Sequence, residues 1–165
     1  MCSSDLATHL PGACDAGRAV SCRQLGALLL RVEGKPDSAK ALASLKAACA
    51  KKDAIGCGLL GELKVVGRRA DRNLVEARAN HQVACDAGIV TSCVDLGVLL
   101  ATGRGGARDL TAAATLFDKA CGARSTRGCV QSQRVKFVTR TAKDGAPFLA
   151  QFDEACKNGE LTACG

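Results

Sequence analysis

Residues 84–97 read ACDAGIVTSCVDLG, and this segment contains two cysteines, Cys85 and Cys93, with seven residues between them. The same C-x7-C spacing occurs five times along the chain of 165 residues, and the first cysteines of successive pairs are 35 or 36 residues apart. The pairs are Cys14 and Cys22, Cys49 and Cys57, Cys85 and Cys93, Cys121 and Cys129, and Cys156 and Cys164. A fixed period of this length predicts a repeat protein.

Other residues recur in phase with the cysteines. Alanine precedes the first cysteine of every pair, and Leu-Gly follows the second cysteine in the first three units, at 25–26, 60–61 and 96–97. Between these marks the apolar residues are spaced by three and four, as in DLTAAATLFDKAC with Leu110, Ala114 and Phe117 on one stripe. Each period therefore predicts two short helices, and stacked helix pairs bury the apolar faces that one pair cannot. The predicted fold class is an all-α, αα-hairpin solenoid.

The expected helix ends also recur. Glycine stands three residues after the first cysteine at Gly17, Gly88 and Gly159, where a left-handed residue would end the helix before the turn. Gly103 is expected to end the helix that follows Cys93. Four aspartates precede the helix that leads to the next cysteine pair, and we expect them to cap its amino end. They are Asp37, Asp71, Asp109 and Asp144.

The cysteine spacing favours one disulfide per repeat. Residues eight apart in a continuous helix are separated by about 12 Å, whereas a disulfide requires Cα atoms within about 7 Å of each other. The chain must therefore turn between the partners, so that each bridge joins the end of one helix to the start of the next. Zinc and redox sites are less favoured alternatives, because neither C-x2-4-C nor C-x-x-C occurs. No metal or other cofactor is predicted.

These motifs resemble the Sel1-like repeat family, and more closely its cysteine-rich subfamily, typified by secreted Helicobacter cysteine-rich proteins. The resemblance covers roughly residues 10–165. It implies a TPR-like superhelix of about four to five units over 1–165, with 1–13 as a truncated or frayed first segment. It also implies a protein-binding scaffold or, alternatively, a weak β-lactamase or a protein that binds penicillin or cell-wall peptides. The fourth unit departs from the pattern, because Ser132-Gln133 replaces Leu-Gly.

The sequence supplies no catalytic motif. The S-x-x-K and K-T-G patterns of penicillin-recognising serine enzymes are missing, as are H-E-x-x-H and the phosphate-binding P-loop. The two histidines, His9 and His81, do not recur with the repeat, so neither is predicted to activate a cysteine. We therefore predict no catalytic residues, and a hydrolase activity is implied only by the family resemblance.

Charge suggests a binding face. The chain has a formal net charge of +7, and the stretch from Arg124 to Lys143 contains six basic residues and no acidic one. Because the first helix of each unit lines the inner surface of related superhelices, four basic residues are expected to border a site for an acidic protein or peptide. They are Lys64, Arg134, Lys136 and Arg140. A merely solvated basic face is the alternative. Nucleic acid is not expected, because aromatic residues make up only 2% of the chain.

Eleven cysteines favour an oxidising compartment, so an extracytoplasmic location is predicted: periplasmic, on the outer membrane or secreted. The chain begins Met1-Cys2-Ser3-Ser4 without an apolar signal segment, so oxidised cysteines would imply that a targeting segment has been removed. Cys2 lies outside the repeat phase and resembles the lipid-carrying first residue of a mature bacterial lipoprotein, which would attach the protein to a membrane. An immunity or adaptor protein for a toxin or a secretion system is a further alternative.

Overall fold

The computed structural model describes residues 3–31, 38–67 and 72–140, and this part of the chain is helical without strands. Seven helices of equal length follow one another, and residues 126–140 form a further helix. The seven are α1 (Ser3–Asp15), α2 (Ala19–Arg31), α3 (Ser38–Ala50), α4 (Ala54–Val66), α5 (Leu74–Asp86), α6 (Val90–Thr102) and α7 (Leu110–Gly122). The all-α prediction is confirmed.

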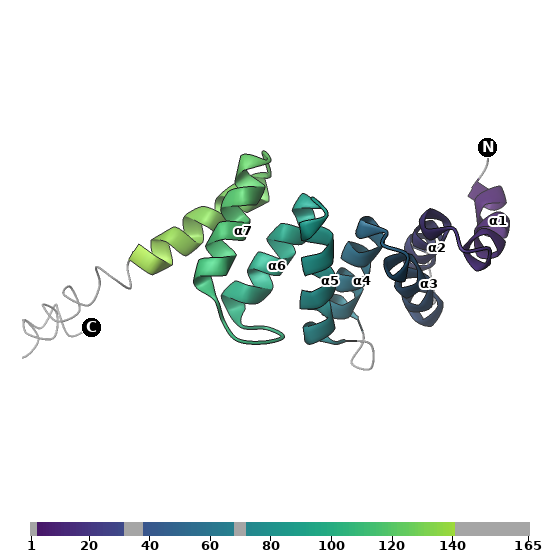
Figure 1. Ribbon diagram of the computed structural model, residues 1–165, viewed down its shortest axis with the longest axis horizontal. Coiled ribbons are helices and arrows are strands. Elements are labelled where there is room, and N and C mark those ends of the chain that lie inside the picture. Colours follow the sequence, from purple (N-terminus) through teal and green to yellow (C-terminus); the bar gives the residue numbers. More distant parts are fainter. Residues whose placement is uncertain (1–2, 32–37, 68–71, 141–165) are drawn as a thin grey trace, which may run out of the picture.

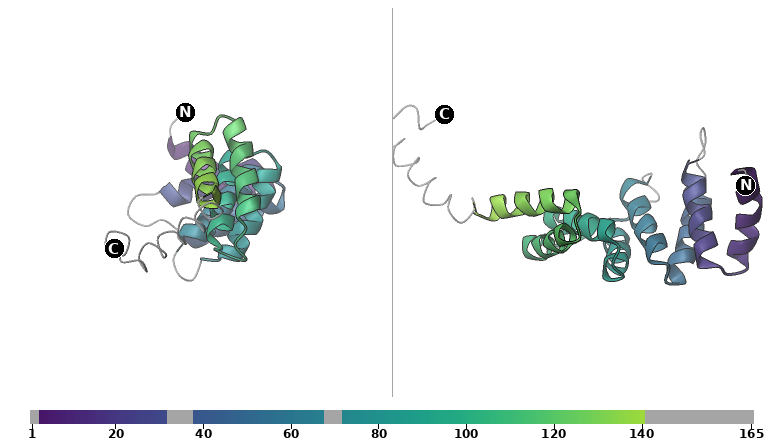
Figure 2. Two further views of the ribbon diagram at one scale, coloured as in Figure 1. Left: turned by 90° about the vertical axis from the view of Figure 1, so that its left-hand side faces the viewer. Right: turned by 90° about the horizontal axis from the view of Figure 1, so that it is seen from above.

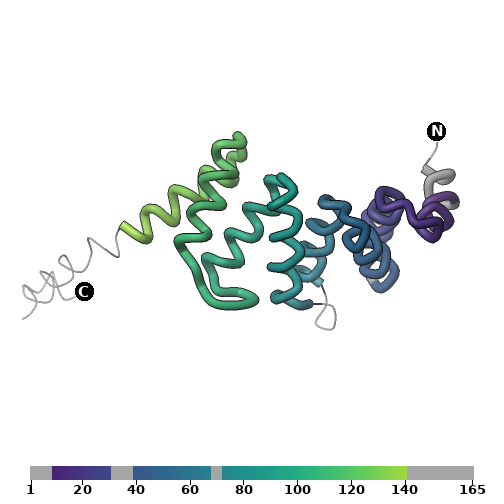
Figure 3. Tube along the Cα trace, in the orientation of Figure 1, coloured from purple at the N-terminus to yellow at the C-terminus, as the bar shows by residue number. Residues whose placement is uncertain are grey.

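The helices stack in sequence order into an elongated solenoid (Figure 1). Each helix packs against the helix before it and the helix after it, and α2 also contacts α4. Seen along its length, the stack has a narrow cross-section (Figure 2). The Cα trace shows how each hairpin reverses direction before the next begins (Figure 3). We call α2, α4, α6 and 126–140 the A helices, and α1, α3, α5 and α7 the B helices.

Each B helix ends in the same disulfide-closed turn. Four disulfides join Cys14 to Cys22, Cys49 to Cys57, Cys85 to Cys93 and Cys121 to Cys129. Their Cα atoms are 4.4 to 4.6 Å apart. The residue three after the first cysteine is left-handed in all four turns, with φ of 87° at Gly17, 63° at Lys52, 90° at Gly88 and 62° at Arg124. The bridge therefore closes the bend that the sequence required, even where the turn residue is not glycine.

The predicted fifth disulfide, between Cys156 and Cys164, is not among the four bridges of the described units. Both Cys156 and Cys164 lie outside the residues that the structure describes, as does Cys2. The bridge from Cys156 to Cys164 therefore stays a prediction from the C-x7-C spacing, and lipid attachment at Cys2 stays a prediction as well.

Side chains cap the helices after four of these turns and linkers, including Ser125 at the helix 126–140, although not always the predicted ones. Asp109 accepts a hydrogen bond from the Ala112 N–H at the start of α7, as expected. The cap of α5 is Asn73, not Asp71, because the helix begins at Leu74. Asp53 caps α4 in the same way. Gly103, with φ of 70°, ends α6 as predicted. Asp37, Asp71 and Asp144 lie outside the described residues.

The glycine of each Leu-Gly pair makes room for one side chain of the following B helix. A Cβ on Gly26 would lie 2.7 Å from Leu45, a Cβ on Gly61 would lie 2.9 Å from His81, and a Cβ on Gly97 would lie 2.6 Å from Phe117. All three distances are shorter than real Cβ contacts, so a larger residue than glycine would have to displace the facing side chain. Leu45, His81 and Phe117 each stand four residues before the first cysteine of a pair, as does Leu10 in the first unit. We call this the junction position, and all four residues are at most 7% exposed.

No helix within the described residues is long and apolar enough to cross a membrane.

Candidate functional site: the groove between α4 and α6

The four basic residues predicted to border a binding site occupy two different environments. Lys64 is 6% exposed, and its ammonium lies 2.9 Å from the Glu76 carboxylate of α5. Hydrogen bonding from Lys64 lowers the pKa of Glu76, which keeps this pair charged. Arg134 and Arg140 are exposed on the helix 126–140. In the stack α6 lies between α4, which carries Lys64, and the helix 126–140, which carries the other three, so the four residues do not form one cluster (Figure 1).

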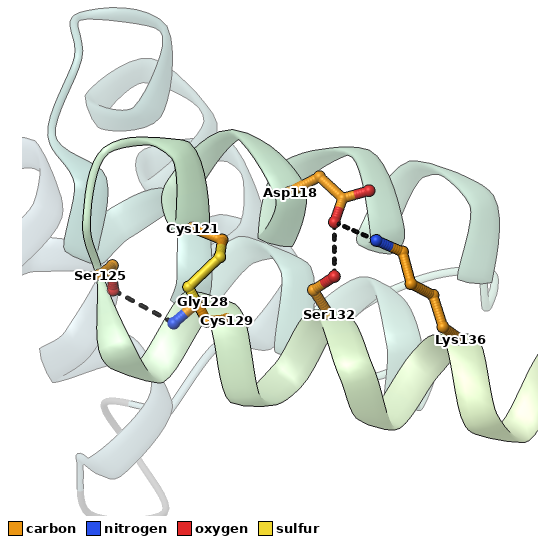
Figure 4. The surroundings of a disulfide bond; sticks show 7 residues. All are labelled: Asp118, Cys121, Ser125, Gly128, Cys129, Ser132 and Lys136. Carbon is orange, nitrogen blue, oxygen red and sulfur yellow. Dashed lines mark hydrogen bonds and ion pairs between the residues drawn. A yellow bond between two sulfur atoms is a disulfide. The ribbon is translucent and has the colours of Figure 1, made fainter.

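Lys136 takes part in a polar cluster that joins α7 to the helix 126–140 (Figure 4). Its ammonium lies 2.8 Å from Asp118, and the buried Ser132 hydroxyl donates to the same carboxylate oxygen. These two hydrogen bonds, first that from Lys136, lower the pKa of Asp118. The departure of the fourth unit from Leu-Gly thus has a structural consequence, because Ser132 stands where the earlier units have leucine. The Ser132 hydroxyl and the Lys136 ammonium are both directed at Asp118.

Lys64 and Lys136 share one position in the repeat, seven residues after the second cysteine. Lys64 forms an ion pair with Glu76 of α5, the B helix that follows it. Lys136 forms an ion pair with Asp118 of α7, the B helix that precedes it. The position therefore faces a B helix.

Arg134 occupies a different repeat position, five residues after the second cysteine of its unit. Glu62 in α4 and Val98 in α6 occupy the same position. Glu62 and Val98 line a groove, so this second position belongs to the face formed by the A helices.

This groove lies between α4 and α6 and has a volume of about 520 Å³. At one end the two helices approach closely, because a Cβ on Gly58 would lie only 2.6 Å from the Ser92 hydroxyl. Aliphatic side chains supply most of its walls, and no Phe lines it. They include Ile55, Leu59, Val65 and Val66 from α4 and Val98 and Leu99 from α6. We call this the α4–α6 groove.

His81 of α5 lines the same groove although it is only 1% exposed. Its Nδ1 atom is buried and has no hydrogen-bond partner among the residues that the structure describes. Burial lowers the pKa of His81, an effect that the nearby Asp95 carboxylate opposes and the Arg127 guanidinium reinforces. The imidazole is therefore neutral at neutral pH, with one nitrogen able to donate a hydrogen bond and the other able to accept one.

Four charged residues surround the aliphatic walls. Asp95 of α6 and Arg127 of the next A helix form an ion pair, with 2.8 Å between carboxylate and guanidinium. Arg104, just after α6, is half-buried, and its guanidinium has no ion pair or hydrogen bond within the described residues. Glu62 of α4 likewise has no ion-pair partner there. The groove thus combines an apolar surface with one unpaired cation and one unpaired anion.

The sequence prediction missed most of this site. Arg127 was recognised only as part of the basic run, and His81 only as a histidine that does not recur. The signal that could have found His81 is its place in the repeat: it stands where the other units have leucine or phenylalanine. A polar residue at an apolar repeat position is visible without a structure. Arg104 lies in the segment GRGG, which the repeat indicates to be a turn, and nothing in the sequence shows that it reaches the groove.

The described residues contain no group of three histidine, cysteine or acidic side chains that could hold a metal ion. The groove instead offers aliphatic contact, an unsatisfied imidazole and an unpaired guanidinium. Such a combination suits non-covalent recognition of a partly apolar ligand with a few polar groups.

Solved structures show the same arrangement of helix pairs. A Sel1 repeat protein from Oxalobacter formigenes is 20% identical with a TM-score of 0.66, covering 77% of this chain and 96% of that one. The chain has the Sel1-like repeat fold. Helicobacter pylori cysteine rich protein B is also similar, with 24% identity and a TM-score of 0.59 over 76% of this chain and 91% of that one.

A protective antigen of uropathogenic Escherichia coli strains with the same fold has a TM-score of 0.72 at 22% identity. The match covers 79% of this chain but only 28% of the antigen, so the chain spans less than a third of that protein. No family model and no curated protein matches the sequence. The similarity therefore concerns the Sel1-like fold, in a form closed by a disulfide in each described repeat.

Proposed function

We propose that this Sel1-like solenoid is a protein-binding scaffold that holds an extended peptide segment of its partner in the α4–α6 groove. The observation that carries the proposal is the groove itself, an aliphatic surface of about 520 Å³ between two A helices that also exposes unpaired charge. Helix-repeat solenoids use such continuous surfaces for binding. The disulfides stiffen the stack, so little order is lost when a partner binds.

The lining favours a peptide over a sugar or a nucleobase. Leu59, Val66 and Val98 provide aliphatic contact but no aromatic platform on which a ring could stack. Extended peptides combine aliphatic side chains with backbone donors and acceptors, which suits walls of this kind. Arg104 and Arg134, together with the net charge of +7, favour a partner segment that is acidic.

The disulfides indicate an extracytoplasmic location, since they persist in oxidising compartments. Within that category we propose a bacterial cell envelope, either the periplasm or the surface of a membrane. Cys2 would carry a lipid anchor in the second case. Mass spectrometry of the protein extracted from membranes would reveal an acylated Cys2 as an added lipid mass, and an unmodified cysteine would exclude the anchor.

A peptide selection tests the binding proposal. Oxidised protein is immobilised and used to select from a random dodecapeptide library, and the selected peptides are synthesised and measured by fluorescence anisotropy. Val66→Glu places an anion in the groove, where it would repel an acidic peptide, at a side chain that is 71% exposed, so the fold tolerates it. We expect this variant to weaken binding at least about tenfold.

The matched control is Val75→Glu, which adds the same charge at a valine that is 67% exposed on α5 and outside the groove. It should bind the selected peptides as the wild type does. If the library yields no binder, or if both variants bind like the wild type, the groove is not the binding site.

A further inference from the structure

His81 breaks the chemical pattern of the junction position. The described units have Leu10, Leu45 and Phe117 there, and the sequence has Phe152 in the fifth unit. Leu45 and Phe117 are fully buried against Gly26 and Gly97 in the way that His81 is buried against Gly61. An apolar side chain of either size therefore fits this position, and packing alone gives no reason for an imidazole.

The imidazole also leaves a polar atom unsatisfied. Within the described part of the chain, the buried His81 Nδ1 atom has no hydrogen-bond partner. Such atoms are rare in native structures and destabilise the fold, because the atom loses its hydrogen bond to water without gaining another. At this junction the chain carries a destabilising side chain where leucine would serve.

The location of His81 suggests what the side chain is for. Among the four described junction residues it is the one that lines the α4–α6 groove, where it packs against Gly61 of α4 and lies near the Asp95–Arg127 pair. Leu45 and Phe117 each belong to a hydrophobic cluster instead, and Leu59 and Val98, which pack against these two clusters, form aliphatic walls of the groove. The groove thus opens at the junction where the polar residue replaces the apolar one.

We propose that His81 is the polar anchor of the groove and that its ligand is an extended peptide segment with an aliphatic side chain close to a carboxylate. In this arrangement the aliphatic side chain lies between α4 and α6, a backbone N–H or C=O group of the peptide gives the imidazole the hydrogen bond it lacks, and the carboxylate pairs with Arg104. This inference rests on the proposed peptide-binding function.

The chemistry of each group supports this arrangement. A neutral imidazole can accept a hydrogen bond from an N–H group or donate one to a C=O group. Rotation of the ring by half a turn about its Cβ–Cγ bond moves Nδ1 to the opposite side of the ring axis, so that Nδ1 can face either side of its site. Arg104 is half-buried without an ion pair among the described residues, so an incoming carboxylate would not have to displace a partner. Glu62 on the opposite wall would repel that carboxylate, which fixes the direction of the peptide.

The test compares two junction positions. Peptides selected on the wild type are measured against His81→Leu, His81→Gln and the matched control Phe117→Leu, which changes the same repeat position outside the groove. We expect His81→Leu to weaken binding about tenfold while raising Tm by about 2–8 °C. His81→Gln keeps a donor and an acceptor and should bind more tightly than His81→Leu. Phe117→Leu should lower Tm and leave the affinity within about twofold.

A second measurement tests the carboxylate. Replacing the peptide's Asp or Glu by Asn or Gln should weaken binding to the wild type, and the same replacement should have little effect on binding to Arg104→Gln. Unchanged affinity in His81→Leu, together with loss of binding in Val66→Glu, would overturn the anchor and leave the peptide groove standing. Selected peptides that lack both an aliphatic and an acidic residue would contradict the assigned ligand class. Binding that is insensitive to Val66→Glu would remove the groove and the anchor together.

Discussion

At the junction of α4 with α5, Gly61 faces His81, whereas at the junction of α6 with α7, Gly97 faces Phe117. The backbone is the same in both places: a glycine in the A helix, a fully buried side chain in the B helix and a disulfide four residues later. Only the chemistry of the buried side chain differs. One repeat unit can therefore exchange an apolar contact for a polar one without altering the solenoid, and this is how a repeat protein can acquire a binding site.

The difference extends to the surroundings. Phe117 belongs to a hydrophobic cluster with Val94, Ala113, Ala120 and Val135, whereas His81 packs against Gly61 and lies near the charged Asp95 and Arg127. The Phe117 junction is thus built for stability. The His81 junction borders a groove, and we expect it to contribute less to the free energy of unfolding.

Truncation to alanine at each junction should give the largest contrast. Phe117→Ala removes a ring that is 1% exposed from a packed cluster, so we expect a loss of about 3–5 kcal/mol in the free energy of unfolding. His81→Ala also leaves space but removes an unsatisfied polar atom, so its loss should be less than about half as large. Denaturant unfolding under oxidising conditions measures both. Equal losses would mean that the two junctions are energetically alike.

The disulfides should show what the junctions share. Both bridges close loops of the same length, with eight residues of sequence separation between the cysteines. The double variants Cys85→Ala/Cys93→Ala and Cys121→Ala/Cys129→Ala should therefore each lose at most about 2.6 kcal/mol, the entropy estimate for a nine-residue loop. A much larger loss at one turn would show that its bridge does more than constrain the unfolded chain.

Lowering the pH should reveal a further difference between the two junctions in their contribution to the free energy of unfolding. Because burial lowers the pKa of His81 in the folded protein, the unfolded chain takes up the proton first as the pH falls. The free energy of unfolding should thus decline below the ordinary histidine pKa of about 6.5 and should not depend on His81 above it.

This acid effect can be measured by comparing unfolding at pH 7.5 and pH 5 in the wild type, His81→Leu and Phe117→Leu. His81→Leu should lose less stability on acidification than the other two proteins. The carboxylates of Glu76 and Asp118, whose pKa values are lowered by their lysine partners, lose their contribution only at lower pH. A parallel decline in all three proteins would show that His81 does not titrate differently on folding.

The sequence predicted the fold well because the fold depends on local, repeated features. The C-x7-C spacing required a turn, and the four described pairs have that turn with Cα atoms 4.4 to 4.6 Å apart. For Cys156 and Cys164, outside the described residues, the bridge is still inferred from the spacing alone. Leu-Gly marked the A helices, although only the structure showed that its glycine receives a side chain of the next B helix. The C-x7-C and Leu-Gly features recur in successive units, so each unit supports the prediction made from the others.

The site was harder to predict because it depends on what does not recur. Lys64 and Lys136 were grouped with Arg134 by charge, but their repeat position faces a B helix, where Glu76 and Asp118 pair with them. The groove arises where Arg104, His81 and Arg127 from three separate segments come together. Charge along the sequence does not reveal whether an ammonium already has a partner, whereas an aligned repeat shows at once that His81 is an exception.

The smallest expected effect concerns the turn after each junction. Gly88, after His81, has φ of 90°, and Arg124, after Phe117, has φ of 62° at the same repeat position. A left-handed conformation costs a residue with a Cβ about 1 kcal/mol, whereas glycine adopts it freely. Arg124→Gly should therefore stabilise the protein by somewhat less than about 1 kcal/mol, because glycine also loses more chain entropy on folding.

The reverse change, Gly88→Ala, should destabilise the protein by about 1 kcal/mol, since open space surrounds Gly88 and only the backbone conformation opposes the new Cβ. Thermal unfolding of Arg124→Gly and Gly88→Ala, each compared with the wild type, measures both effects. Gly122→Ala serves as a control, because it adds a Cβ in open space at the end of α7 where φ is not left-handed. If Gly88→Ala were neutral, the disulfide between Cys85 and Cys93 would by itself be enough to hold the bend, and glycine at this position would need another explanation.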